Sequence, residues 1–221
     1  MLSNRFAGLL VVFAMLPLAC LAQKAELSLT AGGTFISDAN GAFAAVCPPG
    51  IPSCGVANAN VQSGHRIYVE VVPAARLFNL KVAELYLEFP FAAIPSQTLH
   101  FATSPAGVSA GHLSSLFVTP SFKVKLLPTG PVNPFVSLGG GWAVYVLDNG
   151  NNTRGALQYG GGVDLKTGTR HLRFRAEIRD FVTAHPNFDN AEGAPLGFNT
   201  FDRSGLHRNN VLLGGGIVLN F

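Results

Sequence analysis

The chain has 221 residues, of which 48% are hydrophobic and 12% are charged, and its formal net charge is +3. Removal of Arg5 with the N-terminal segment discussed below lowers that charge by one unit, and a charge this small gives no reason to expect a nucleic-acid partner. The roughly 200 residues beyond that segment make one domain.

The first 22 residues have the pattern of a secretory signal peptide. Arg5 supplies a positive start, Phe6 to Leu18 are apolar, and Cys20-Leu21-Ala22 offers small residues where a signal peptidase cuts. We therefore expect residues 1–22 to be a signal peptide and residues 23–221 to be the domain. A lipoprotein acylated at Cys20 is the alternative, although Pro17 fits the lipoprotein pattern poorly.

Eight later stretches alternate between apolar and polar residues and are predicted to be β-strands. They are about 25–37, 65–76, 81–93, 114–127, 132–148, 155–166, 170–183 and 208–221. Each is long enough to cross a membrane as a tilted strand, which takes ~9–11 residues.

The connections between these strands differ in length. Short connections are expected at 77–80, 128–131 and 167–169, and longer ones at 38–64, 94–113, 149–154 and 184–207. Long and short connections that alternate in this way predict an all-β, eight-stranded antiparallel up-and-down transmembrane β-barrel, with short turns at the periplasmic end and longer loops outside.

Two cysteines lie in the first long connection. Cys47 and Cys54 are separated by Pro-Pro-Gly-Ile-Pro-Ser, and in an exported chain such an isolated pair predicts a disulfide within a loop. A metal site would need more ligands nearby, so we expect no metal and no cofactor.

The two faces of each strand predict which side chains point into the lumen of the barrel. In 81–93, for example, Leu85 and Leu87 lie opposite Glu84 and Glu88. A membrane barrel is apolar outside and polar inside, so the polar faces should line the lumen and pair their charges there. The expected lumen network is Glu26, Glu70, Glu84, Glu88, Lys123, Lys125, Asp164, Arg173, Arg175, Glu177 and Arg179.

The closing stretch, Gly216-Ile-Val-Leu-Asn-Phe221, also alternates and ends on an aromatic residue. With the signal, the eight strands and the order of the connections, it resembles the small outer-membrane β-barrels of the OmpA-like transmembrane, OmpX and OmpW type. The resemblance implies a monomer in the outer membrane of a Gram-negative-type envelope. It also implies that Gly216, Leu219 and Phe221 form a signal for the barrel-assembly machinery, and that the barrel meets outer-membrane lipid and lipopolysaccharide.

The sequence leaves three functions open. The first is a non-enzymatic barrel with a salt-bridged lumen, whose outer loops have structural or surface-interaction roles. The second is a narrow pore or a passage for small solutes, as in OmpW-like barrels, since several strand glycines leave room inside. The third is an enzyme that modifies lipid A at the outer rim, for which His112, Ser114 and Asp148 are the candidate residues.

Overall fold

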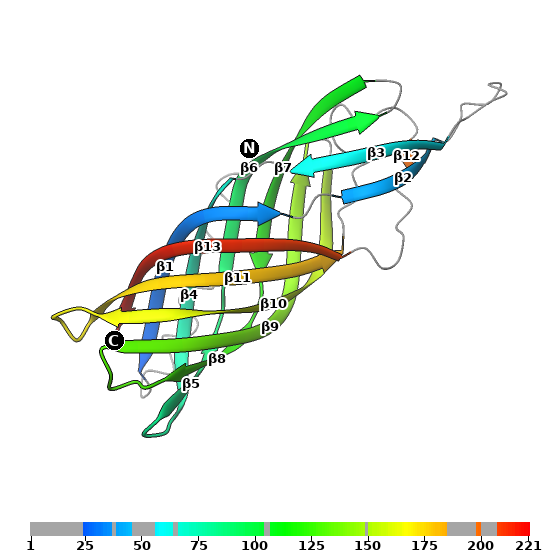
Figure 1. The fold of residues 1–221 in the computed structure, drawn as a ribbon. Coiled ribbons are helices and arrows are strands. Elements are labelled where there is room, and N and C mark those ends of the chain that lie inside the picture. The colour runs from blue at the N-terminus through cyan, green and yellow to red at the C-terminus, as the bar shows by residue number, and fades with distance from the viewer. Residues whose placement is uncertain are drawn as a thin grey trace.

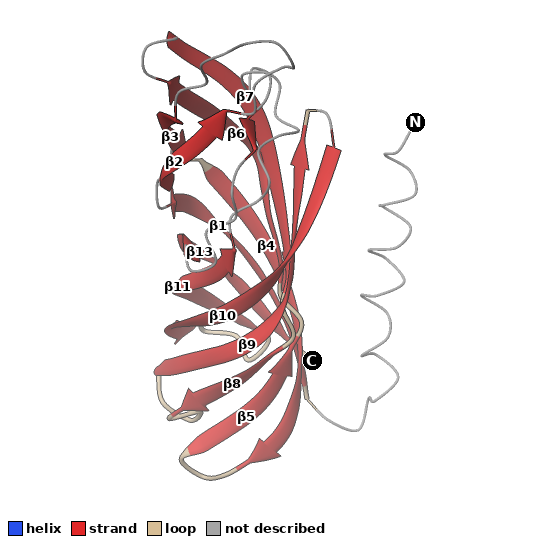
Figure 2. Ribbon diagram, turned by 90° about the vertical axis from the view of Figure 1, so that its right-hand side faces the viewer, coloured by secondary structure: helices blue, strands red, loops and turns tan. Residues whose placement is uncertain are grey.

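The computed structural model describes residues 24–36, 39–45, 56–63, 66–103, 107–148, 150–184, 198–199 and 207–221. All the regular structure in these residues is β-strand (Figures 1 and 2). The described part of the chain contains no helix long and apolar enough to span a membrane.

The strands form one antiparallel sheet that closes on itself. In chain order they are β1 (Ala25–Ile36), β2 (Ala39–Ala45), β3 (Val56–Ser63), β4 (Ile67–Asn79), β5 (Ala83–Glu88), β6 (Phe91–Thr103), β7 (Gly107–Val118), β8 (Ser121–Leu126), β9 (Val132–Leu147), β10 (Gly150–Lys166), β11 (Leu172–Ala184), β12 (Phe198–Asn199) and β13 (His207–Asn220). The order around the barrel is β1-β4-β5-β8-β9-β10-β11-β13, and the pairing of β13 with β1 closes the ring.

Two of the eight barrel strands are interrupted near a proline. β5 and β6 follow one another along a single position of the ring, with Phe89 and Pro90 between them, and both pair with β4. β7 and β8 share the next position, with Thr119 and Pro120 between them, and both pair with β9. A proline cannot donate a ladder hydrogen bond, which explains the breaks. The predicted eight-stranded antiparallel barrel is confirmed.

The predicted connections at one end of the barrel are partly wrong. We expected loops at 94–113 and 149–154, but β6 runs to Thr103, β7 begins at Gly107 and β10 begins at Gly150. These strands continue as hairpins beyond the barrel ring (Figure 1). The segment 94–113 has many small and polar residues and only scattered large apolar ones, such as Leu99 and Phe101, so its alternation is too short to predict long strands.

We call the two ends of the barrel the turn end and the loop end. The β4–β5, β8–β9 and β10–β11 connections, the start of β1 and the end of β13 lie at the turn end. At the loop end the first connection contains β2 and β3, whose backbone adds to the edge of β6, and β12 pairs with β2. Cys47 and Cys54 lie outside the described residues, so the disulfide remains a prediction.

The two faces of the barrel wall have opposite character. Large hydrophobic side chains are exposed on the outside, among them Leu29, Val69, Phe122, Val136, Leu138, Trp142, Leu157, Phe174, Ile178 and Leu213. Along β11, Arg175, Glu177 and Arg179 alternate with these outward residues and are buried inside. A barrel wall of this kind is suited to lipid outside and to a polar lumen.

Candidate functional site: the lumen

Eight charged side chains form a closed ring across the lumen. Alternating in sign, the ring runs Glu26, Lys123, Glu88, Arg179, Glu177, Arg175, Asp164 and Lys125 before it returns to Glu26. The members come from five strands, β1, β5, β8, β10 and β11, because inward positions of separate strands meet across the lumen. We call this set the ionic ring.

The ion pairs of the ring are close and almost completely buried. Lys123 Nζ lies 3.0 Å from Glu26 Oε2 and 2.7 Å from Glu88 Oε1. Lys125 Nζ lies 2.5 Å from Glu26 Oε1 and 2.8 Å from Asp164 Oδ2. No side chain of the ring is more than 3% exposed. Each charge has a neighbour of opposite sign on both sides, which offsets the cost of removing it from water.

The arginines complete the ring along β11. The Arg175 guanidinium binds Asp164 through two nitrogens, at 2.7 and 3.1 Å, and its Nη1 also donates to the Ser28 hydroxyl. Arg179 Nη2 lies 3.4 Å from both Glu88 and Glu177. The bidentate pair fixes the plane of Arg175 and is the geometry that only a guanidinium supplies.

The other predicted lumen charges lie beside the ring. Glu70 is buried and lies 3.4 Å from Arg179 Nε. Nearer the turn end, Glu84 is joined to Arg76 at 2.8 Å and accepts a hydrogen bond from the Tyr86 hydroxyl. Arg173 is half-buried and donates to Asn133.

Aromatic faces support the cations of the ring. Lys123 Nζ lies 4.7 Å from the centre of the Tyr86 ring, and the Arg175 guanidinium lies 4.5 Å from the centre of the Phe135 ring. These cation–π contacts add attraction between side chains that are buried.

A second, apolar layer lies between the ionic ring and the loop end. Its buried members are Tyr68, Ala92, Ile94, Leu113, Phe117, Ala143, Tyr145, Leu147, Ala156, Phe181 and Leu212. Phe117 stacks on Phe181 at 4.6 Å and meets Tyr145 edge to face at 6.2 Å. We call this set the aromatic layer. The sequence predicted a polar lumen. This prediction is wrong for the aromatic layer, which is mainly apolar.

Polar side chains mark the loop-end side of the aromatic layer. Arg208 is buried there, donates to Gln97 and Asn210, and lies over the Tyr145 ring. The Tyr145 hydroxyl is 2.6 Å from that of Thr183. The sequence analysis missed Arg208, although it precedes Asn210 by two residues and Leu212 by four, which places all three on one face of the strand.

The glycines within strands serve close backbone approach. A Cβ added to Gly141 would overlap the Val118 carbonyl oxygen, and one added to Gly216 would overlap that of Leu29. Neighbouring strands pack too closely at these points for any side chain. At Gly141 and Gly216 the backbone of the neighbouring strand occupies the place of a side chain, so these glycines leave no extra room in the lumen.

The candidate rim residues lie together on the outer face near the loop end. Asp148 accepts a hydrogen bond from the backbone N–H of His112 at 2.9 Å, and Ser114 is two residues from His112 on β7. The Ser114 hydroxyl, however, donates to the Pro95 carbonyl at 2.5 Å. Because that proton is directed to a backbone oxygen, the serine is not oriented toward a base.

The residues predicted to form the assembly signal lie in the closing strand β13 or directly after it. Gly216 and Leu219 lie in β13 opposite Thr30 and Leu27, and the backbone N–H of Phe221 donates to Ala25. Within the described residues, no group of three or more His, Cys, Asp or Glu side chains is placed to hold a metal ion.

The class of protein that these features define is a membrane-type β-barrel: eight strands, an apolar exterior and a charged interior. Three solved structures resemble it. The outer membrane protein OprG from Pseudomonas aeruginosa has a TM-score of 0.54 at 10% identity, covering 90% of this chain and 96% of OprG. Neisserial surface protein A has a TM-score of 0.47 at 10% identity, covering 90% of this chain and 97% of its own. Ail, the attachment invasion locus protein of Yersinia pestis, has a TM-score of 0.37 at 12% identity, covering 88% of this chain and 99% of Ail.

The fold of this chain is thus that of the small outer-membrane β-barrels, and the similarity to OprG carries this conclusion. No protein-family model matches the chain, and no curated protein matches it in sequence. The fold predicted from the sequence resemblance is confirmed. The role of the protein must be argued from its own residues.

Proposed function

We propose that this protein is a non-enzymatic integral protein of the bacterial outer membrane whose lumen is closed by the ionic ring. The ring is the observation that carries the proposal. An eight-stranded barrel has an interior that side chains just fill, and here the ring members join five of the eight strands through paired charges. An ion entering this layer would have to displace charges that already have partners.

The segments at the loop end are the parts we propose for contact with the surroundings. The β6–β7 hairpin and the β2–β3 hairpin extend beyond the barrel ring (Figure 1), and the backbone of Phe198–Asn199 pairs with β2. Such segments on a rigid scaffold are where recognition is usually built. Lipopolysaccharide and other outer-membrane lipids are the proposed partners, and the barrel-assembly machinery is the proposed partner during insertion.

Single-channel recording in a planar bilayer tests this function. Folding is checked first by the change in gel mobility that folded barrels show on heating. We expect folded protein to insert and to give no long-lived open steps. Regular open steps from the folded protein would contradict closure by the ring, and failure to insert would contradict the membrane assignment itself.

A passage for small apolar solutes is the second candidate, and the aromatic layer favours it. The layer places buried apolar side chains within the lumen, among which a hydrophobic molecule would be better placed than an ion. Uptake of an apolar dye into vesicles carrying the barrel tests this candidate. It predicts faster uptake than into empty vesicles, and a slower rate in a Phe117→Arg variant.

The enzyme hypothesis has less support. His112, Ser114 and Asp148 are neighbours, but the Ser114 hydroxyl donates to a carbonyl rather than to a base. Mass spectra of lipid A from cells that overproduce the chain test it directly. An unchanged acyl pattern is the result that our proposal requires.

A further inference from the structure

Four exposed cations lie around the rim at the turn end. Lys24 directly precedes β1, Lys81 lies in the β4–β5 turn, Lys166 ends β10, and Arg170 lies in the β10–β11 connection. Because β10, β11, β13, β1, β4 and β5 are consecutive neighbours in the sheet, these four positions form one arc. We call this set the basic arc.

The charge of the basic arc is not balanced by neighbouring side chains. Among the described residues at the turn end, no carboxylate side chain is exposed. Glu84, the acid nearest this end on β5, is buried and already binds Arg76 at 2.8 Å, and Asp164 belongs to the ionic ring. The rim therefore presents positive charge to whatever lies against it.

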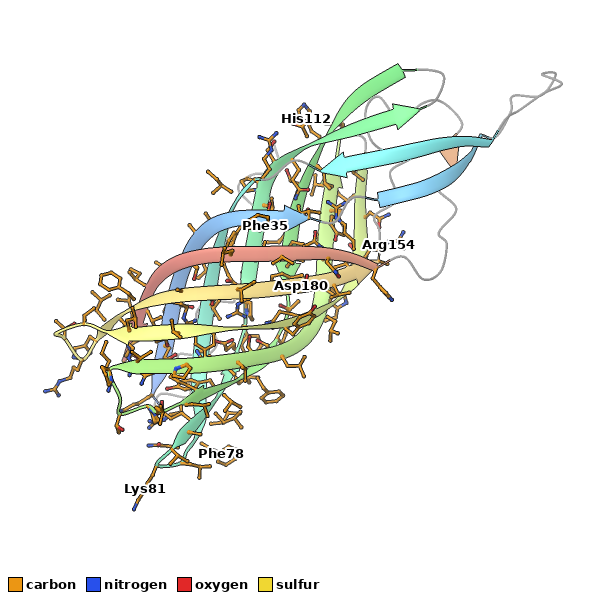
Figure 3. All side chains as sticks on the ribbon, viewed as in Figure 1. Phe35, Phe78, Lys81, His112, Arg154 and Asp180 are labelled. Carbon is orange, nitrogen blue, oxygen red and sulfur yellow. The ribbon has the colours of Figure 1, made fainter. Side chains whose placement is uncertain are left out.

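Exposed apolar side chains accompany the basic arc. Phe78, Leu80 and Val82 at the β4–β5 turn are 64%, 64% and 68% exposed, and Leu127 on the adjoining β8–β9 connection is 58% exposed. The Leu127 N–H donates to the Val82 carbonyl, so the two turns are in contact. Figure 3 shows Phe78 and Lys81 at the tip of this hairpin. Apolar side chains beside cations match the boundary between acyl chains and headgroups.

We propose that the basic arc binds the anionic phospholipid headgroups of the leaflet that meets the turn end. Ammonium and guanidinium groups donate charge-assisted hydrogen bonds to phosphate oxygens, while Phe78 and Leu80 enter the acyl region and set the depth of the rim. Lys166 Nζ already donates to the Thr129 carbonyl at 2.7 Å, which holds it over the rim with donors left for a phosphate. This inference rests on the proposed membrane insertion.

The test is native mass spectrometry of the full chain released from nanodiscs that contain equal amounts of phosphatidylglycerol and phosphatidylcholine. The measured quantity is the ratio of the two lipids that remain bound. We expect phosphatidylglycerol to be retained in roughly tenfold excess, since several cations act together at one surface. The variant K24Q/K81Q/K166Q/R170Q should lose most of this excess.

The matched control removes cations from the opposite end. R66Q/R154Q lowers the net charge but leaves the basic arc intact, so the preference for phosphatidylglycerol should persist. The half-arc variants K24Q/K81Q and K166Q/R170Q should each give an intermediate ratio. All the substituted side chains of the arc are exposed, and the gel shift on heating confirms that each variant is folded.

Three results overturn the inference: no lipid preference in the unaltered chain, an unchanged preference in the fourfold variant, or an equal loss in the control. The failure of the proposed function is distinct. A chain that does not insert into the nanodiscs would contradict the membrane assignment. A chain that inserts but shows no lipid preference would contradict only the proposed lipid binding by the basic arc.

Discussion

The two layers of the lumen differ in what holds them together. In the ionic ring each charge depends on two or more partners, and Arg179 alone contacts Glu70, Glu88 and Glu177. In the aromatic layer the contacts of Phe117, Tyr145 and Phe181 are mainly those of apolar surfaces. The ring should therefore tolerate little change in chemistry, while the aromatic layer should tolerate any change that keeps its volume.

Substitution of Arg179 by Met should give the largest loss of stability. It leaves three buried carboxylates without their shared cation, which costs about 3–5 kcal/mol in the free energy of unfolding. Urea unfolding of the barrel in lipid vesicles measures this loss. Arg66→Met, which removes an exposed cation at the loop end, is the control and should change the free energy by less than about 0.5 kcal/mol. Similar losses in the two variants would remove the special role of the ring.

A charge placed on the outer face should have the next largest effect. Leu213 is 51% exposed on β13, and Leu213→Arg should cost ~2–4 kcal/mol if the position faces the middle of the bilayer. Leu219→Arg, on the same face but near the turn end, should cost only ~0–1 kcal/mol because the arginine reaches the headgroups. The same unfolding experiment compares the two variants. Equal tolerance of both would mean that the two faces are assigned the wrong way round.

A change within the aromatic layer that keeps its volume should cost less than either. Phe181→Leu keeps most of the side-chain volume beside Phe117, so the expected loss is below about 1.5 kcal/mol. A loss as large as that of Arg179→Met would contradict the proposed difference between the layers. Phe181→Ala sharpens the test, since the cavity it leaves should raise the cost to roughly 3–5 kcal/mol.

The smallest effect on stability is expected at Phe221, which is 69% exposed. Phe221→Ala should leave the unfolding free energy of refolded protein within about 0.5 kcal/mol. If the residue belongs to an assembly signal, the amount of folded barrel in cell envelopes should fall several-fold. Envelope fractions read by the gel shift measure this amount, and equal effects on both quantities would reject the assembly role.

The alternation of the sequence was enough to predict the ionic residues but not the aromatic layer. In β8, Lys123 and Lys125 alternate with Phe122 and Val124, so the polar face is evident. In β7, Phe117 faces inward while its neighbours Leu116 and Val118 face outward, and an apolar residue on both faces gives no period of two. The members of the aromatic layer can be recognised only from the assembled barrel, in which side chains from separate strands come together.

The sequence also could not predict which charged residues of the ionic ring pair with one another. Lys123 and Glu26 are 97 residues apart, and their contact depends on the heights of β1 and β8 across the lumen. Alternation says which way a side chain points but not which residue of a distant strand it meets. The length of β6 and β7 was missed because large apolar residues are sparse in their extensions beyond the barrel, so no sustained alternation marks them.

The central claim is that the ionic ring, and not the aromatic layer, closes the lumen. The most direct test is single-channel conductance of three folded proteins in the same bilayer: the unaltered chain, Glu88→Ala with Lys123→Ala, and Phe117→Ala. The account predicts that only the ring variant conducts, because it loses two adjacent members of the ring. Conductance by the unaltered chain, or by Phe117→Ala alone, would contradict it.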